Sequence, residues 1–304
     1  MLKYAVRRFI TSLLTLFLMI TLTFFLMQMV PGGPFLGENV KKDAVDRLLA
    51  KYGFDRPIHE QYIKYLGNLL HGDLGVSIVE KHGKPVLDTI GNGLPISLKL
   101  GFMALGIAIV LGIPLGALAA TKHNTFLDRV FVLFASFAVS VPSFIMTIAL
   151  MLVFGVWLRI LPVAYLESWK SYIMPVFGMS VYALFGLARL TRTSMLDVMG
   201  QDYIKTARAK GLSQWVVVFK HGFRNAVLPV ITQLAPMVAG ILTGSFVVEK
   251  VFAIPGVGKY FVGAIGSRDY PLIMGTAILY GVMLIFCNYA VDLLYGIIDP
   301  RIKM

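Results

Sequence analysis

The stretch LGFMALGIAIVLGIPLGALAAT, residues 100–121, contains no charged side chain. The hydrocarbon core of a bilayer is about 30 Å thick, and roughly 20 apolar helical residues cross it. This stretch is therefore long enough to be a transmembrane helix. Five further runs of 18 or more residues carry no charge, namely 9–37, 130–158, 171–188, 225–248 and 270–291. Because these runs lack the strict alternation of barrel strands, the sequence predicts an all-α polytopic membrane protein with six transmembrane helices.

The overall composition agrees with a membrane protein. Of the 304 residues, 57% are hydrophobic and 14% are charged, whereas a soluble domain carries about 25% charged residues. The one cysteine, Cys287, excludes an internal disulfide and a cysteine metal cluster. The net charge of +12 would suit nucleic acid if it were clustered on one face. The largest local excess is +5 in residues 189–224, and charge that sets the topology of a membrane protein explains most of the total, so we expect no nucleic-acid partner.

The first charge-free run resembles a signal peptide in its basic flank. Its 22 apolar-rich residues from 9 to 30, however, exceed a signal-peptide core of about 7–15 residues. The run ends in Pro31-Gly32-Gly33-Pro34, which is not a small-residue cleavage site. We therefore expect residues 1–30 to form the N-terminus and a retained first transmembrane helix.

The distribution of Lys and Arg predicts the orientation of the chain. Six spans place both termini on one side of the membrane. Outside the long segment from Lys41 to Lys99, Lys and Arg number 14 on the side of the termini and 5 on the other. Because basic residues in short loops mark the cytoplasmic side, we expect both termini in the cytoplasm. The same charge would face anionic membrane lipid.

Two loops stand out between the predicted spans. Residues 31–98 form an extracytoplasmic loop, in which apolar residues at helical spacing predict short amphipathic helices near 45–52 and 58–69. These helices could form a docking rim for an external partner or a cap over the bundle. Residues 99–304 form a five-helix core that contains a cytoplasmic loop at 189–228.

The cytoplasmic loop contains a short predicted helix. Asp202 is suited to cap the N-terminus of a helix over residues 203–210, and Gly211 lies where a helix-ending glycine is expected. Its small residues Ala207 and Ala209 would let another surface approach closely. This pattern fits a helix that contacts a protein, or an interfacial helix held by anionic lipid.

Motifs for catalysis or for nucleotide binding are missing from the sequence. There is no phosphate-binding Gly-x-x-x-x-Gly-Lys-[Ser/Thr] loop, no zinc-protease helix and no Gly-x-Ser-x-Gly elbow. No ionisable relay of the kind used by proton-coupled carriers lies within the six runs. We therefore expect a protein that is not an enzyme and that binds no metal or cofactor of its own.

The fifth run, 225–248, is the most polar of the six. Its side chains Gln233, Thr243 and Ser245 could line a wet path, and we expect them to form the path wall. The pairs Gly112-x-x-x-Gly116 and Gly240-x-x-x-Gly244 predict close helix packing. Val141-Pro142 and Ile113-Pro114 are candidate kinks.

The cytoplasmic loop also carries a resemblance to a known family. Lys205-Thr206-Ala207-Arg208-Ala209-Lys210-Gly211, followed by residues 221–229 with Leu228-Pro229, resembles the signature loop of ABC-importer permeases. Lys205 and Thr206 depart from the general Glu-Ala pattern but fit the peptide and nickel branch. Further segments resemble the B-type subunits of oligopeptide permeases, namely 31–35, 71–75, 141–144, 249–252, 255–258, 268–270, 291–295 and 299–301.

The resemblance implies a fold, a function and a set of partners. It implies the type I ABC-importer permease fold and ATP-driven oligopeptide import across a bacterial cytoplasmic membrane. The implied partners are a homologous C-type permease subunit, two cytoplasmic ABC ATPase subunits that bind ATP and Mg²⁺, an extracytoplasmic peptide-binding protein and the peptide. Residues 205–211 would couple the bundle to one ATPase. The rim facing the binding protein would include His71, Asp73, Glu249, Arg268 and Asp269.

Other functions stay open at this point. A dipeptide or nickel importer would share the architecture, although the predicted membrane helices hold no Met/His cluster suited to nickel. A secondary transporter without an ATPase, or a structural scaffold, are more distant alternatives.

Overall fold

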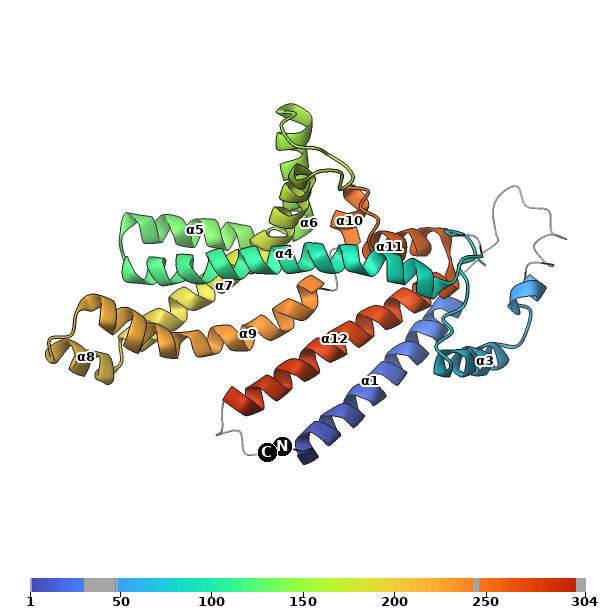
Figure 1. Ribbon diagram of the computed structural model, residues 1–304, viewed down its shortest axis with the longest axis horizontal. Coiled ribbons are helices and arrows are strands. Elements are labelled where there is room, and N and C mark those ends of the chain that lie inside the picture. The colour runs from blue at the N-terminus through green and yellow to red at the C-terminus, as the bar shows by residue number, and fades with distance from the viewer. Residues whose placement is uncertain (1, 30–46, 48, 82, 243–245, 299–304) are drawn as a thin grey trace.

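The computed structural model describes residues 2–29, 47, 49–81, 83–242 and 246–298 of the chain. Its elements are helices (Figure 1), and the described residues contain no β-strand, in agreement with the all-α prediction. The α-helices are α1 (Leu2–Met29), α3 (Ile58–Leu70), α4 (Val86–Thr121), α5 (Phe126–Ser140), α6 (Ser143–Leu150), α7 (Ile173–Met199), α8 (Asp202–Ala209), α9 (Arg224–Leu242), α10 (Phe246–Val251), α11 (Val257–Ser267) and α12 (Tyr270–Ile298). Two π-helices, η1 (Met151–Trp157) and η3 (Val216–Phe223), and a 3₁₀-helix, η2 (Trp169–Tyr172), lie between them.

Four of the six charge-free runs lie on single helices that are long and apolar enough to span a membrane. These spans are Val6–Met29, Val86–Thr121, Trp169–Met199 and Tyr270–Ala290. The other two runs lie on bent helix pairs: α5 followed by α6 and η1, with a bend of 103°, and Val216–Leu234 followed by Pro236–Val251, with a bend of 40°. The predicted number of six spans therefore holds if each bent pair counts as one span.

The sharp bend between α5 and α6 lies at a predicted kink. Val141 ends α5 and Pro142 precedes the first residue of α6. Proline has no backbone N–H to continue the helical ladder, so the chain turns here. Pro114, the other candidate kink, lies inside the continuous helix α4.

The predicted close packing at Gly112 and Gly116 is confirmed. A Cβ atom on Gly112 would lie 2.6 Å from the Leu184 carbonyl oxygen of α7, and one on Gly116 would collide with the Ala188 carbonyl oxygen. The two glycines therefore bring the backbones of α4 and α7 into direct contact, as small residues do between membrane helices. Gly240, in contrast, has no atom within 4 Å of its ideal Cβ position.

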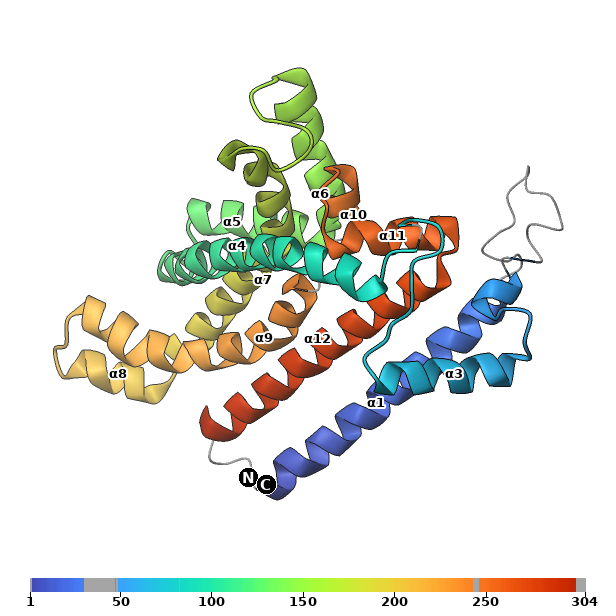
Figure 2. The ribbon, with the colours of Figure 1, turned by 45° about the vertical axis from the view of Figure 1, so that its right-hand side comes forward.

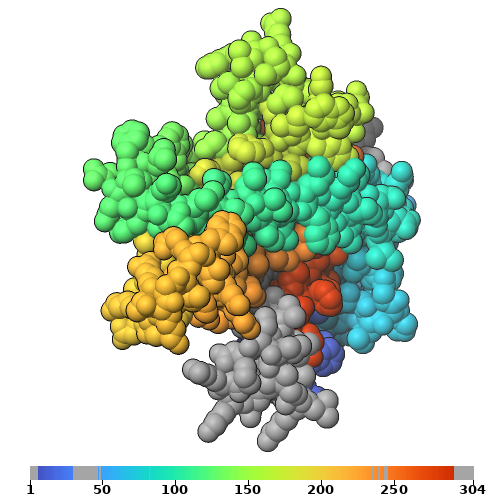
Figure 3. Space-filling view, turned by 60° about the vertical axis from the view of Figure 1, so that its left-hand side comes forward, coloured from blue at the N-terminus to red at the C-terminus, as the bar shows by residue number. Residues whose placement is uncertain are grey.

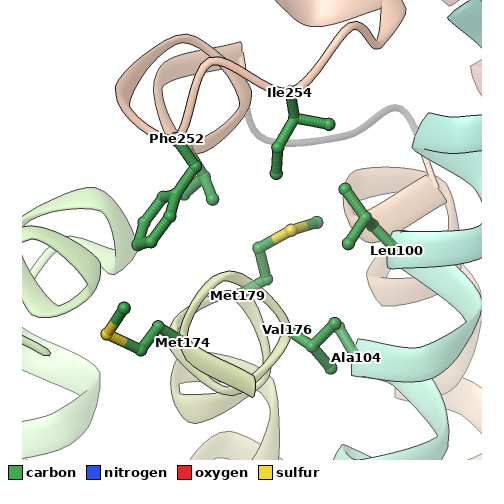
Figure 4. Close-up of a cluster of buried hydrophobic side chains, with 8 residues drawn as sticks. Leu100, Ala104, Met174, Val176, Met179, Phe252 and Ile254 are labelled. Atoms are coloured by element: carbon green, nitrogen blue, oxygen red, sulfur yellow. The ribbon is translucent and has the colours of Figure 1, made fainter. Parts of the chain in front are cut away.

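A buried apolar cluster joins α4, α7 and the segment after α10. Leu100 from α4, Met174 and Met179 from α7, and Phe252 and Ile254 point toward one another (Figure 4). Each of these side chains is at most 6% exposed. The cluster fixes the position of α10 against the two central helices.

The described helices form a bundle with two distinct ends. α1 and α12 pack together and run antiparallel, so the start of α1 and the end of α12 lie at the same end (Figures 1 and 2). α8 lies at the left-hand end of Figure 1, and α3 and α11 lie at the right-hand end. The predicted amphipathic helix near 58–69 is α3. Of the other, near 45–52, residues 49–52 are helical, while residues 45, 46 and 48 lie outside the described residues.

A buried ion pair closes the turn between α4 and α5. Asp128 is 3% exposed, and its two oxygens accept from Arg192 Nε at 2.6 Å and from Arg192 Nη2 at 2.8 Å. The backbone N–H of Asn124 also donates to Asp128, at 3.0 Å. A bidentate charge-assisted pair of this kind is geometrically specific, and it ties the start of α5 to α7.

Candidate translocation and coupling site

The short helix predicted in the loop 189–228 lies within one residue of its predicted position. α8 spans Asp202–Ala209, and Gly211 follows with φ +75°. A positive φ is accessible to glycine at low cost, so the predicted helix-ending glycine is confirmed. The N-cap prediction is wrong, because Gln201 occupies that position and Asp202 instead pairs with Lys205 at 2.9 Å. A helix boundary assigned from hydrogen bonds can shift by a residue or two. The side chain of Asp202, however, contacts the Lys205 ammonium and not a backbone N–H of the first turn, so it does not cap the helix.

One face of α8 packs onto the π-helix η3. Ile204 is fully buried, Ala207 is 7% exposed, and both contact Val217 of η3, which is also fully buried. The surface that closely approaches Ala207 is therefore η3 of the same chain and not a partner, whereas Ala209 is exposed. Asn225 at the start of α9 adds a hydrogen bond to the Tyr203 hydroxyl at 2.8 Å. Together these contacts hold an eight-residue helix that would be too short to be stable alone.

The other face of α8 is exposed and basic. The exposed residues of α8 are Asp202, Tyr203, Lys205, Thr206, Arg208 and Ala209, and exposed Lys210 follows directly. Three basic side chains thus outnumber the single acid, Asp202. In the space-filling view the yellow-to-orange lobe formed by α8 and its neighbours stands below α4 and α5, with its outer side uncovered (Figure 3). The arrangement offers a small, positively charged surface on a helix whose position is fixed from behind.

A groove of about 480 Å³ opens between α6, α7, α9 and α10. Gln233, a predicted path residue, lines it, whereas Thr243 and Ser245 lie outside the described residues. The lining residues are Ser143, Met179, Tyr182, Ala183, Gln233, Pro236, Met237, Gly240, Ile241, Phe246 and Val247. Sequence reasoning missed the lining residues outside α9, because they come from three other helices.

The chemistry of the groove is weakly polar. A hydroxyl from Ser143, a phenol from Tyr182 and the amide of Gln233 interrupt an otherwise apolar lining. The lining contains no carboxylate, ammonium, guanidinium or imidazole group. Such a surface can hydrogen-bond to a peptide backbone without selecting one side-chain charge.

The predicted rim residues fall into two groups. His71 and Asp73 are exposed. Arg268, which directly follows α11, is partly exposed. Glu249 and Asp269 are fully buried. The prediction of an exposed rim position is therefore wrong for these two acids, whose carboxylates are enclosed by the protein.

Asp269 is buried because it receives a set of converging donors. Its Oδ2 atom accepts from the Ser77 hydroxyl at 2.5 Å and from the backbone N–H groups of Ile78, Val79 and Glu80 at 3.0–3.1 Å. Its Oδ1 atom accepts from the Leu272 N–H at 3.3 Å. The carboxylate thus fastens a segment near residue 78 to the start of α12.

Glu249 is enclosed in a similar way at the other end of α11. Its Oε2 atom accepts from the backbone N–H of Gly258 at 2.8 Å and of Lys259 at 3.4 Å. A Cβ atom on Gly256 would collide with the Glu249 carboxylate. The Gly256-Val257-Gly258 segment therefore lets a carboxylate of the same chain approach the N-terminus of α11, where it complements the helix dipole.

A second hollow, of about 320 Å³, lies among α1, α3 and the start of α12. Asp73 lines it together with Lys64 and Tyr65 of α3. Burial raises the pKa of the Tyr65 hydroxyl above its ordinary value. Among the described residues, no three or more His, Cys, Asp or Glu side chains are grouped so as to hold a metal ion.

Four long apolar helices and two bent helix pairs define a polytopic helical membrane protein. The chain belongs to the family of binding-protein-dependent transport system inner membrane components. The model of that family matches residues 112–304, and the model of the N-terminal part of such membrane components matches residues 1–101. The resemblance to ABC-importer permeases is thereby confirmed.

Named relatives cover the whole chain. The dipeptide transport system permease protein DppB of Bacillus subtilis (strain 168) is 46% identical over 305 residues, covering 100% of this chain and 99% of the relative. The oligopeptide transport system permease protein OppB of Haemophilus influenzae is 41% identical over 309 residues, covering 100% of both chains. OppB of Escherichia coli (strain K12) is 38% identical with the same coverage.

Solved structures share the fold at low sequence identity. An amino acid ABC transporter crystallised with histidines matches with a TM-score of 0.56 and 16% identity, over 69% of this chain and 94% of that chain. The MetNI methionine ABC transporter in an inward-facing conformation matches with a TM-score of 0.55 and 19% identity, over 72% and 98%. Together with the family match, these neighbours confirm the predicted ABC-importer permease fold.

Proposed function

We propose that this chain is the transmembrane subunit of an ATP-driven peptide importer. The observation that carries the proposal is α8, whose inner face is packed on η3 while its basic outer face is bare. Because the inner face of α8 packs on η3, and η3 contacts α7 and α9, a force applied to the outer face of α8 would be transmitted to α7 and α9. A cytoplasmic ATPase seated on residues 205–211 would deliver that force.

The partners follow from the same proposal. A homologous C-type permease would supply the other half of the path, and two ABC ATPase subunits would bind ATP and Mg²⁺ beneath the bundle. A peptide-binding protein would deliver peptide to the opposite end, where His71, Asp73 and Arg268 are accessible. The excess of Lys and Arg supports cytoplasmic termini in a bacterial inner membrane. The start of α1 and the end of α12 lie at one end of the molecule (Figure 1), which agrees with placing both on the same side.

The groove near Gln233 is our candidate for this chain's share of the path. Its few neutral polar groups suit the repeating amides of a peptide backbone. Nickel ions favour nitrogen and oxygen ligands, and the lining holds no His, Asp or Glu. The groove therefore supports peptide over nickel as cargo. We propose oligopeptides as the cargo, with dipeptides as the alternative, since relatives with both names are similar over their full length.

Photo-cross-linking from α8 tests the coupling part of the proposal. In the complete complex, a photoreactive residue at Thr206 or Arg208 should cross-link to an ATPase subunit, because both positions are on the exposed face. The same photoreactive residue at Lys84, which is exposed and lies two residues before the start of α4, serves as the control and should give no such product. Equal cross-linking from both ends, or none from α8, would refute the coupling role.

Filling the groove should block transport without disturbing the fold. Gly240 lines the groove, and no atom lies within 4 Å of its ideal Cβ position. We expect Gly240→Phe to lower peptide uptake by about tenfold or more, since a side chain of this size fills much of a pocket of a few hundred Å³. Gly106→Phe, on α4 and also with open space around its Cβ position, is the matched control and should transport normally. Normal uptake by Gly240→Phe would exclude this groove as the path.

A further inference from the structure

α11 is held at both ends by buried carboxylates. At its N-terminus, Glu249 of α10 accepts from the N–H groups of Gly258 and Lys259. Ser97 of α4 adds a contact at the same place, because its hydroxyl accepts from the Val257 N–H at 3.0 Å. The start of α11 is therefore tied to both α10 and α4.

The C-terminal end of α11 is tied to a strap, which we define as the described residues 76–81 and 83–85. The Asp269 N–H donates to the Ala264 carbonyl of α11 at 2.9 Å. The Asp269 carboxylate accepts hydrogen bonds from the Ser77 hydroxyl and from the backbone N–H groups of residues 78–80. The strap closes on itself, because Ser77 N–H donates to the Lys84 carbonyl at 2.9 Å. The Lys81 ammonium also lies 4.8 Å from the ring centre of Tyr260 on α11.

Glycines bring α11 into close contact with its neighbouring elements, so that α11 cannot move past them without a clash. A Cβ atom on Gly93 of α4 would lie 3.0 Å from the Val257 nitrogen, and one on Gly258 would lie 2.8 Å from the Phe246 Cα atom. A Cβ atom on Gly263 would lie 2.9 Å from the Glu80 carboxylate of the strap. α11 is thus in close contact with α4, α10 and the strap at once.

An aromatic cluster connects α11 directly to the groove. The ring of Phe246, which lines the groove, lies 5.0 Å from Phe261 of α11 and 4.7 Å from Tyr280 of α12, measured between ring centres. The rings of Phe261 and Tyr280 are 5.8 Å apart. A displacement of α11 would therefore move a side chain of the groove wall.

From these contacts we infer that the strap, α10 and α11 form one rigid plate, with Glu249 and Asp269 as its positioning residues, which transmits events at the extracytoplasmic surface to Phe246 in the groove. The inference rests on the proposed function, since the event at that surface is the arrival of the loaded peptide-binding protein. Glu249 and Asp269 are fully buried, so they act by holding the plate together and not by touching the partner.

Distances between spin labels test the rigidity of the plate in a protein that retains Glu249 and Asp269. With Cys287 replaced by serine, labels are placed on Lys250 of α10, Ile265 of α11 and Lys84 of the strap, which are all exposed. The distances from Ile265 to the other two should be the same in the nucleotide-free complex and in the complex trapped with ATP and vanadate. A change in either distance between the two states would overturn the inference.

Substitution of the two carboxylates tests the transmission. In the complete complex, Glu249→Gln and Asp269→Asn should each reduce the ratio of stimulated to basal ATP hydrolysis by about five- to tenfold, where loaded binding protein is the stimulus. Asp88→Asn, which removes one exposed charge at the same end, is the control and should leave the ratio unchanged. An unchanged ratio in the two buried variants would overturn the inference.

The two tests also separate the inference from the proposed function. If a variant does not assemble, the label distances in the otherwise unmodified protein still decide whether the plate is rigid. Peptide uptake by the complete complex tests the proposed function alone. Normal uptake together with a label distance that changes would refute the rigid plate and would leave the proposed importer function supported.

Discussion

If the proposed function holds, we expect Ile204→Asp to abolish ATP-driven peptide uptake while the membrane helices of the chain stay assembled. Ile204 is fully buried between α8 and η3. Burying an unpaired carboxylate there costs more than about 3 kcal/mol, which shifts the equilibrium from docked to undocked α8 by about a hundredfold or more. Detached from η3, an eight-residue helix has too few hydrogen bonds to persist. Uptake into proteoliposomes, together with the elution profile of the complex, measures the effect.

The control for this variant introduces the same charge in the same loop. Gln201 is exposed and occupies the N-cap of α8. Aspartate is favoured at that position, so Gln201→Asp should transport normally. Wild-type uptake by Ile204→Asp would show that α8 does not have to be packed on η3 for transport.

We expect Gly116→Leu to prevent the chain from folding. Gly116 of α4 faces the Ala188 carbonyl of α7 so closely that a Cβ atom collides with it. The side chain cannot move aside, because the obstacle is backbone, and we expect a cost well above the roughly 1–3 kcal/mol of ordinary overpacking. Since α4 and α7 form the centre of the bundle, their separation exposes the cores on both sides. The expected result is loss of monodisperse protein after extraction from the membrane.

The matched control is Gly106→Leu on the same helix. Gly106 has no atom within 4 Å of its ideal Cβ position, so leucine there is accommodated and also favours helix. Its yield should equal that of the wild type. Equal yields from Gly116→Leu and Gly106→Leu would contradict the close α4–α7 contact.

Much of the fold could be predicted because lipid imposes a simple rule. A helix that crosses the bilayer must be long and free of charge, and the six charge-free runs lie on the four long helices and the two bent pairs. Pro142 also indicated the place of the sharp bend, since a missing N–H is a local property. The angle of 103° could not be predicted, because it depends on how α6 packs against α7 and α10.

The site was less predictable because its residues meet across long stretches of sequence. The bounds of α8 followed from local signals such as Gly211, but the burial of Ala207 depends on Val217, which belongs to the next helix. Asp269 stands beside Arg268 and resembled one half of a surface charge pair. The donors to its Oδ2 atom lie 189–192 positions away, and no local pattern indicates them.

The measurement that tests the central claim most directly is uptake of a labelled peptide by proteoliposomes that contain the complete complex. The binding protein and peptide are placed on one side, and ATP is placed on the side of the ATPases. Accumulation of peptide that requires ATP, and that a sodium or proton gradient cannot replace, is the expected result. Accumulation driven by an ion gradient without ATP, or uptake of nickel in place of peptide, would contradict the assignment of this chain to an ATP-driven peptide importer.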